Sequence, residues 1–112
     1  MKSKPYRKAE IRYKDQRAGF LSEIDTGYEF VYDQDFLRTG CPISVSFPPR
    51  EEPYHSKELF SFFKGLLPEG WYLTIVSDAA KIDPKDSFGL LLATAADTIG
   101  AVTVHALGLP HD

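Results

Sequence analysis

Apolar and polar residues alternate along the first third of the chain. In residues 9–13, Ala9, Ile11 and Tyr13 alternate with the charged Glu10 and Arg12, which is typical of a strand with one buried face. Residues 18–24 and 28–32 are predicted to form two further strands, and short turn-forming segments separate the three. Neighbouring strands joined by short turns indicate an antiparallel meander.

The hydrophobic pattern in the middle of the chain predicts one more strand. In residues 43–47, Ile43, Val45 and Phe47 share one face, and Pro48 ends the segment because proline cannot donate to a ladder. Residues 33–40 are predicted to be a loop or a short helical turn, and residues 50–55 a polar loop.

After residue 55 the hydrophobic period becomes that of helices. A first helix is predicted from Ser56 as N-cap to Pro68, a second over residues 71–80 and a third over residues 88–96, before a last strand at residues 101–107. The pattern predicts a single α+β domain, residues 1–112, with about three helices packed on one face of a mostly antiparallel sheet. The expected inward-facing residues are Leu59, Phe60, Phe63, Leu66 and Leu67 in the first helix, Leu73, Val76 and Ala80 in the second, and Leu91, Leu92 and Ala95 in the third.

Length, charge and cysteine usage narrow the function classes. The chain has 112 residues, which suits one domain, and a formal net charge of −3, which argues against direct nucleic-acid binding. No run of about 18 apolar residues is present, so no membrane span is expected. A single cysteine and no secretion signal are typical of a reducing, cytoplasmic location.

The residues offer little catalytic chemistry. Cys41 and His55 form a conceivable nucleophile–base pair, and an enzyme of unknown type stays open as an alternative on that basis. The adjacent acids of residues 51–52 are typical of a solvated loop, and Asp83 and Asp86 flank a helix start, where carboxylates serve as caps. The three histidines lack metal-ligand spacing and the glycines form no phosphate-binding loop, so no metal or cofactor is expected.

The only tryptophan is the most informative residue. Trp71 follows Pro68 and Gly70 at a predicted helix start, with Tyr72 beside it. Trp71 either closes the end of the core or anchors an interface, because tryptophan and tyrosine dominate binding hot spots.

Several motifs, taken in order, resemble the N-terminal subdomain of HipA-type toxin kinases. The similarity covers about residues 10–107, and each motif alone is weak. The motifs are Gly19-Phe20-Leu21, Phe30-Val31-Tyr32-Asp33, Pro42-Ile43-Ser44-Val45-Ser46-Phe47-Pro48, Leu59-Phe60-Ser61-Phe62-Phe63-Lys64-Gly65-Leu66-Leu67-Pro68-Glu69-Gly70, Phe88-Gly89-Leu90-Leu91 and Asp97-Thr98-Ile99-Gly100-Ala101-Val102.

The resemblance implies a function through binding. HipA kinases carry their ATP site and metal ligands after this subdomain, so a freestanding copy is similar to HipS proteins, the small components of three-gene HipBST toxin–antitoxin systems. There the small protein inhibits HipT, a serine/threonine kinase, and HipB is a helix-turn-helix DNA-binding protein. The implied function is a non-enzymatic antitoxin with a HipT-like kinase, and a HipB-like protein as a further partner. The alternative is a detached subdomain that acts as a structural part of a kinase.

Two positions depart from the kinase pattern. The kinases usually have Gly where Ala96 stands, and they commonly have Arg shortly after the Leu-Pro-Glu-Gly stretch, where this chain has Trp71 and Tyr72. A large aromatic residue at that place predicts contact with a separate kinase, so Trp71, Tyr72, Glu69 and Lys64 are the expected partner-binding residues.

Overall fold

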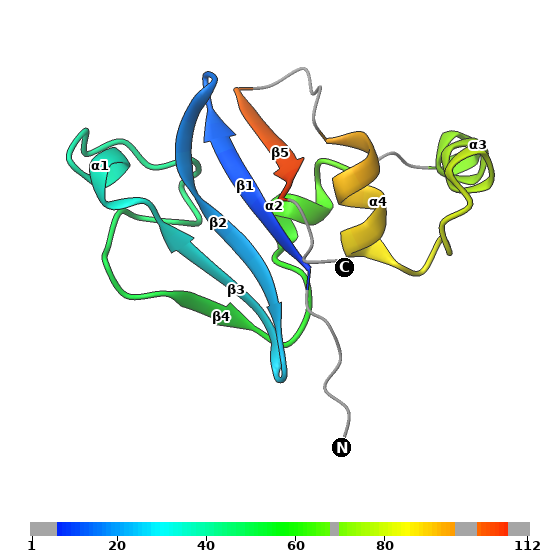
Figure 1. Ribbon diagram of the computed structural model, residues 1–112, viewed down its shortest axis with the longest axis horizontal. Coiled ribbons are helices and arrows are strands. Elements are labelled where there is room, and N and C mark those ends of the chain that lie inside the picture. Colours follow the sequence, from blue (N-terminus) through cyan, green and yellow to red (C-terminus); the bar gives the residue numbers. More distant parts are fainter. Residues whose placement is uncertain (1–6, 68–69, 96–100, 108–112) are drawn as a thin grey trace.

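The computed structural model describes residues 7–67, 70–95 and 101–107, with only the backbone of residues 70–72. Within these residues the chain forms a five-stranded sheet and four helices (Figure 1). The elements in chain order are β1 (Lys8–Tyr13), β2 (Gln16–Ile24), β3 (Gly27–Tyr32), α1 (Gln34–Leu37), β4 (Tyr54–Ser56), α2 (Ser61–Lys64), α3 (Gly70–Ala80), α4 (Ser87–Thr94) and β5 (Val102–Ala106).

The sheet is antiparallel throughout, with strand order β4-β3-β2-β1-β5. The meander and the last strand are confirmed, and the last strand pairs with β1 at the edge of the sheet. Gly19 is required where β2 meets β3, because a Cβ there would lie 2.3 Å from the carbonyl oxygen of Val31.

One face of the sheet forms the core. Alternate residues of the strands, among them Ile11, Leu21 and Phe30, are fully buried. Phe30 lies at the centre, with ring centroids 4.9 Å from Phe47 and 5.8 Å from Phe63. The helices cover this face with Phe36 from α1, Phe63 from α2, and Phe88 and Leu91 from α4. The α+β class with helices packed on a mostly antiparallel sheet is therefore confirmed.

The prediction of a strand over residues 43–47 is wrong. The segment is a turn, in which Phe47 N–H donates to the Ser44 carbonyl at 3.0 Å. Ile43 and Phe47 are buried, but Val45 is 93% exposed and does not share their face. The Tyr32 hydroxyl explains this geometry, because it accepts from Ile43 N–H at 3.0 Å and donates to the Phe47 carbonyl.

The fourth strand lies instead in the segment predicted as a polar loop. Strand β4 pairs with β3 through Tyr54, opposite Phe30, and Ser56, opposite Tyr28. Ser56 is thus a strand residue rather than a helix N-cap, and the first helix is only the short α2. The apolar stripe still packs on the core: Leu59 and Phe63 are buried, and Phe60, Leu66 and Leu67 are partly buried.

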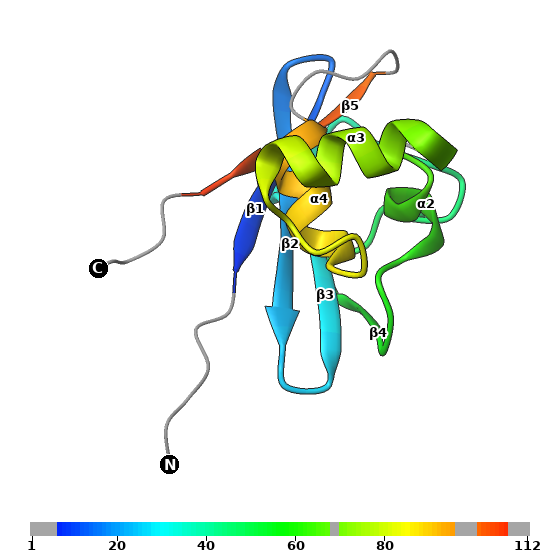
Figure 2. The ribbon, with the colours of Figure 1, turned by 90° about the vertical axis from the view of Figure 1, so that its right-hand side faces the viewer.

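The other two helices are found close to their predicted bounds. Helix α4 begins with Asp86 as its cap, as predicted, because the carboxylate accepts from Gly89 N–H at 3.1 Å. Helix α3 lies outermost, with α4 between it and the sheet (Figures 1 and 2). Ala80, expected to face inward, is exposed, and the buried residue on α3 is Ser77. Since α3 stands apart from the sheet, the part of its surface that is buried is smaller than the sequence predicted.

Candidate partner-binding site

Arg7 holds together one end of the sheet. Its guanidinium lies 2.8 Å from Glu23 Oε2 at the end of β2 and 2.9 Å from Asp86 Oδ1 at the start of α4. It also lies 5.2 Å from the centroid of the Phe88 ring. The hydrogen bonds to the two carboxylates, that to Glu23 first, raise the pKa of Arg7 well above its usual value. The start of β1, the end of β2 and the start of α4 are therefore fixed relative to one another.

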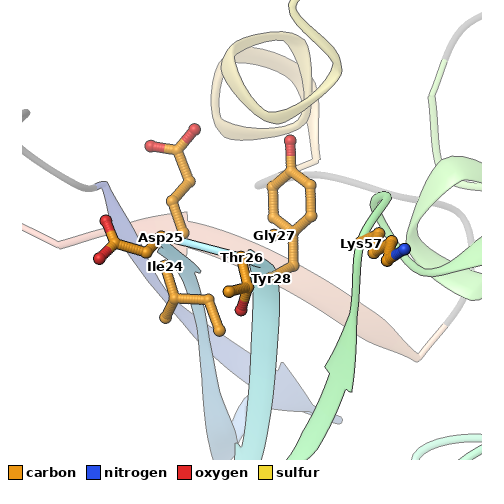
Figure 3. Close-up of a pocket in the computed structure, with 7 residues that line it drawn as sticks. Ile24, Asp25, Thr26, Gly27, Tyr28 and Lys57 are labelled. Atoms are coloured by element: carbon orange, nitrogen blue, oxygen red, sulfur yellow. The ribbon is translucent and has the colours of Figure 1, made fainter.

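Two clefts adjoin this ion-pair cluster. The first, which we call the hairpin cleft, follows the turn between β2 and β3 and has a volume of about 550 Å³. Figure 3 shows Asp25 and Lys57 on its two flanks, with Tyr28 between them. The second, which we call the lysine cleft, has a volume of about 280 Å³ and is lined by Tyr28, Lys57, Glu58, Leu59, Lys64, Lys85, Asp86 and Ser87.

The lysine cleft combines a rigid wall with positive charge. The Tyr28 ring lies 5.9 Å from that of Phe88, and burial, reinforced by the Glu23 carboxylate, raises the pKa of the Tyr28 phenol above its usual value. Leu59 is only 4% exposed and joins the cleft to the core. Among the ammonium groups, Lys64 pairs with Glu58 at 3.3 Å.

The predicted partner-binding residues divide into two sets. Lys64 lies exposed on α2, where it lines the lysine cleft. Trp71 and Tyr72 lie in the first turn of α3, and their side chains are outside the description. Glu69 lies outside the described residues altogether. Because Glu69 and the side chains of Trp71 and Tyr72 are outside the description, the joint role of the four residues stays a prediction.

Two further residues of the lysine cleft were missed from the sequence. Lys57 and Lys85 are 28 positions apart, and each stands among polar residues typical of a solvated loop. Their proximity depends on the β4–β3 pairing and on the contact of Arg7 with Asp86, and neither contact leaves a pattern in the sequence.

The enzyme alternative receives no supporting geometry from the described residues. His55 Nε2 lies 3.0 Å from Glu29 Oε2, and none of the hydrogen bonds of the described residues joins His55 to the exposed Cys41 thiol. In the same part of the chain, no group of three or more His, Cys, Asp or Glu residues is arranged to hold a metal ion. A search of the described helices finds none that is long and apolar enough to cross a membrane.

Comparison with known proteins decides the family. The family model described as the HipA N-terminal domain matches residues 9–105. The chain belongs to this family. A solved structure of the N-terminal domain of HipA toxin is 30% identical, with a TM-score of 0.71, and the match covers 96% of this chain and 98% of that domain.

Two relatives of this chain differ in size. An uncharacterized protein of Haemophilus influenzae is 38% identical over 86 residues, which are 77% of this chain and 79% of that protein. That relative is therefore a small protein of much the same length. The putative kinase Y4mE of Sinorhizobium fredii is 34% identical over 85 residues, 74% of this chain but only 19% of the kinase. The domain is thus found both in a small protein and as a minor part of a putative kinase.

Proposed function

We propose that the protein is an antitoxin that binds and inhibits a HipA-like serine/threonine kinase toxin encoded as a separate chain. The observation that carries this proposal is the extent of the match: the chain corresponds to 98% of the HipA toxin N-terminal domain but to 19% of the putative kinase Y4mE. The similarity to HipS proteins, and a relative of similar length in Haemophilus influenzae, support a small protein that acts on such a kinase. A HipB-like DNA-binding protein is the proposed third component.

Trp71 is the proposed anchor of the interface. It lies in the outermost helix, α3, one turn before Ile75, whose side chain is 51% exposed. Residues four positions apart on a helix share a face, so Trp71 and Ile75 together would present an apolar contact to the kinase. Tyr72 and Glu69 lie next to this anchor in sequence, and Lys64 extends the proposed contact to α2.

The test uses a HipA-like kinase that is encoded in the same genome and lacks this N-terminal domain. It measures whether the protein binds this kinase and inhibits it. Trp71→Ala is expected to weaken binding at least about 30-fold, since a hot-spot residue contributes about 2 kcal/mol or more. Val45→Ala is the matched control, because it removes an apolar side chain that is 93% exposed in the 43–47 turn, away from α3. A folded Trp71→Ala protein that inhibits as well as the unmodified protein would refute the anchor.

A second function has support from the match to Y4mE: a detached N-terminal domain that completes a kinase as a structural part. The two functions predict opposite signs in one assay. Adding the protein to the kinase and ATP is expected to lower phosphorylation of the kinase's substrate if the protein is an inhibitor. An increase would establish the structural part and exclude the antitoxin.

A further inference from the structure

The start of β1 and the end of β5 lie side by side at the Arg7 end of the sheet. Leu107, just after β5, donates its N–H to the Lys8 carbonyl at 3.1 Å, which places the end of β5 beside the start of β1. The neighbouring residue, Arg7, binds Glu23 and Asp86, which line the hairpin and lysine clefts. In a kinase that carries this domain at its N-terminus, the remainder of the chain begins at this end of the sheet. A separate kinase that replaces that remainder is expected to lie against the same end.

The lysine cleft holds uncompensated positive charge at this end. Lys57 and Lys85 are exposed, and neither ammonium group has a hydrogen bond or ion pair with any described residue. The carboxylates of the cleft are engaged, because Glu58 pairs with Lys64 and Asp86 with Arg7. Two unpartnered cations therefore lie together in a chain whose net charge is −3.

The size of the cleft indicates the kind of group that fits. A volume of about 280 Å³ lies at the lower limit of pockets that hold whole small molecules, so it suits one or two side chains of a docked segment. The wall is held in place by Tyr28 against Phe88 and by the buried Leu59. Two lysines on an acidic chain are too few for nucleic acid, which requires a broad basic surface.

We propose that the lysine cleft docks an acidic segment of the partner kinase, with Asp or Glu carboxylates of that segment paired to Lys57 and Lys85. This site rests on the proposed function and adds to it the chemistry of the surface that the kinase presents. It is distinct from the α3 anchor, since Trp71 supplies apolar contact and the cleft supplies charge complementarity.

The test measures the affinity of the same kinase for charge variants. Lys57→Glu/Lys85→Glu is expected to weaken binding about tenfold or more at low salt, and Lys57→Gln/Lys85→Gln by a smaller factor, because only the first adds repulsion. Raising the salt concentration is expected to weaken binding of the unmodified protein and to have less effect on the neutral variant. Lys14→Glu is the matched control, since Lys14 is exposed in the β1–β2 turn at the opposite end of the sheet.

A carbodiimide, which joins an amine to a carboxylate directly, gives an independent measurement. Cross-links from Lys57 or Lys85 to Asp or Glu of the kinase are expected, and none from Lys14. The melting temperature of each variant checks that it is folded. It is expected to stay unchanged, because both cleft lysines are exposed and unpartnered in the described structure. Tight binding that survives double charge reversal overturns the docking site and leaves the antitoxin proposal intact. Absence of binding by the unmodified protein overturns both.

Discussion

The Tyr32 hydroxyl fixes both ends of the 43–47 turn, and its removal tests how this turn is held. The oxygen accepts from Ile43 N–H at 3.0 Å and donates to the Phe47 carbonyl. Ile43 and Phe47 are 6% and 2% exposed. Tyr32→Phe keeps the ring in the core and leaves one backbone donor and one acceptor of these buried residues without a partner.

The expected cost follows from these two orphaned groups. Each unsatisfied buried polar group costs about 1–3 kcal/mol, so Tyr32→Phe is expected to lower the free energy of unfolding by about 2–6 kcal/mol. Tyr54→Phe is the matched control, because the Tyr54 hydroxyl donates to the carbonyl of Pro48, an exposed residue. Water replaces that bond, so the control is expected to cost less than about 1 kcal/mol.

Urea unfolding followed by circular dichroism measures both variants, and the slope m reports whether the folded states stay compact. In thermal unfolding, the Tyr32→Phe protein is expected to melt roughly 8–24 °C lower, at about 4 °C per kcal/mol for a domain of this size. Equal stabilities of the two variants would show that the Tyr32 hydroxyl does not hold the 43–47 turn.

Three further predictions concern stability. Arg7→Ala is expected to lower the free energy of unfolding in urea by about 1–3 kcal/mol, because it removes half-buried ion pairs to two elements. Arg38→Ala removes an exposed ion pair to Asp35 and is expected to lower it by under about 0.5 kcal/mol. Equal losses in the two variants would contradict the role of the Arg7 cluster. Gly27→Ala is expected to lower the free energy of unfolding by more than about 3 kcal/mol, since Gly27 has φ 141° and a Cβ there would lie 2.1 Å from the Ser56 carbonyl oxygen. Gly40→Ala, at φ 74° and with open space around the position, is expected to lower it by about 1 kcal/mol. Similar melting temperatures of the two variants would refute this difference. Burial raises the pKa of Tyr32 above its usual value near 10, so the unfolded chain loses the proton first and stability is expected to fall as pH rises above about 10. The fall in the free energy of unfolding between pH 9 and 11 is expected to be smaller in Tyr32→Phe, and an equal fall would contradict the assignment.

The sequence determined the meander, the last strand and the third helix. Strands β1 to β3 follow from alternation because their core side chains recur at every second residue, and a shift by one residue would turn these side chains away from the core. Helix α4 follows from a local signal, since Asp86 caps it through a contact three residues away. The order of the motifs also predicted the family, which the match to residues 9–105 shows.

The fourth strand and the lysine cleft depend on contacts between segments that are far apart in the sequence. Residues 43–47 have the alternating pattern of a strand, but the Tyr32 hydroxyl from β3 binds both ends of the segment and holds it as a turn. Strand β3 pairs with residues 54–56 instead. Lys57 and Lys85 line one cleft, and Arg7 holds the segment next to Lys85 in place through Asp86, 79 positions away in the sequence. Hydrophobic alternation and helix caps depend on residues a few positions apart, so the sequence predicts them. These contacts join distant segments and exist only once the sheet has formed.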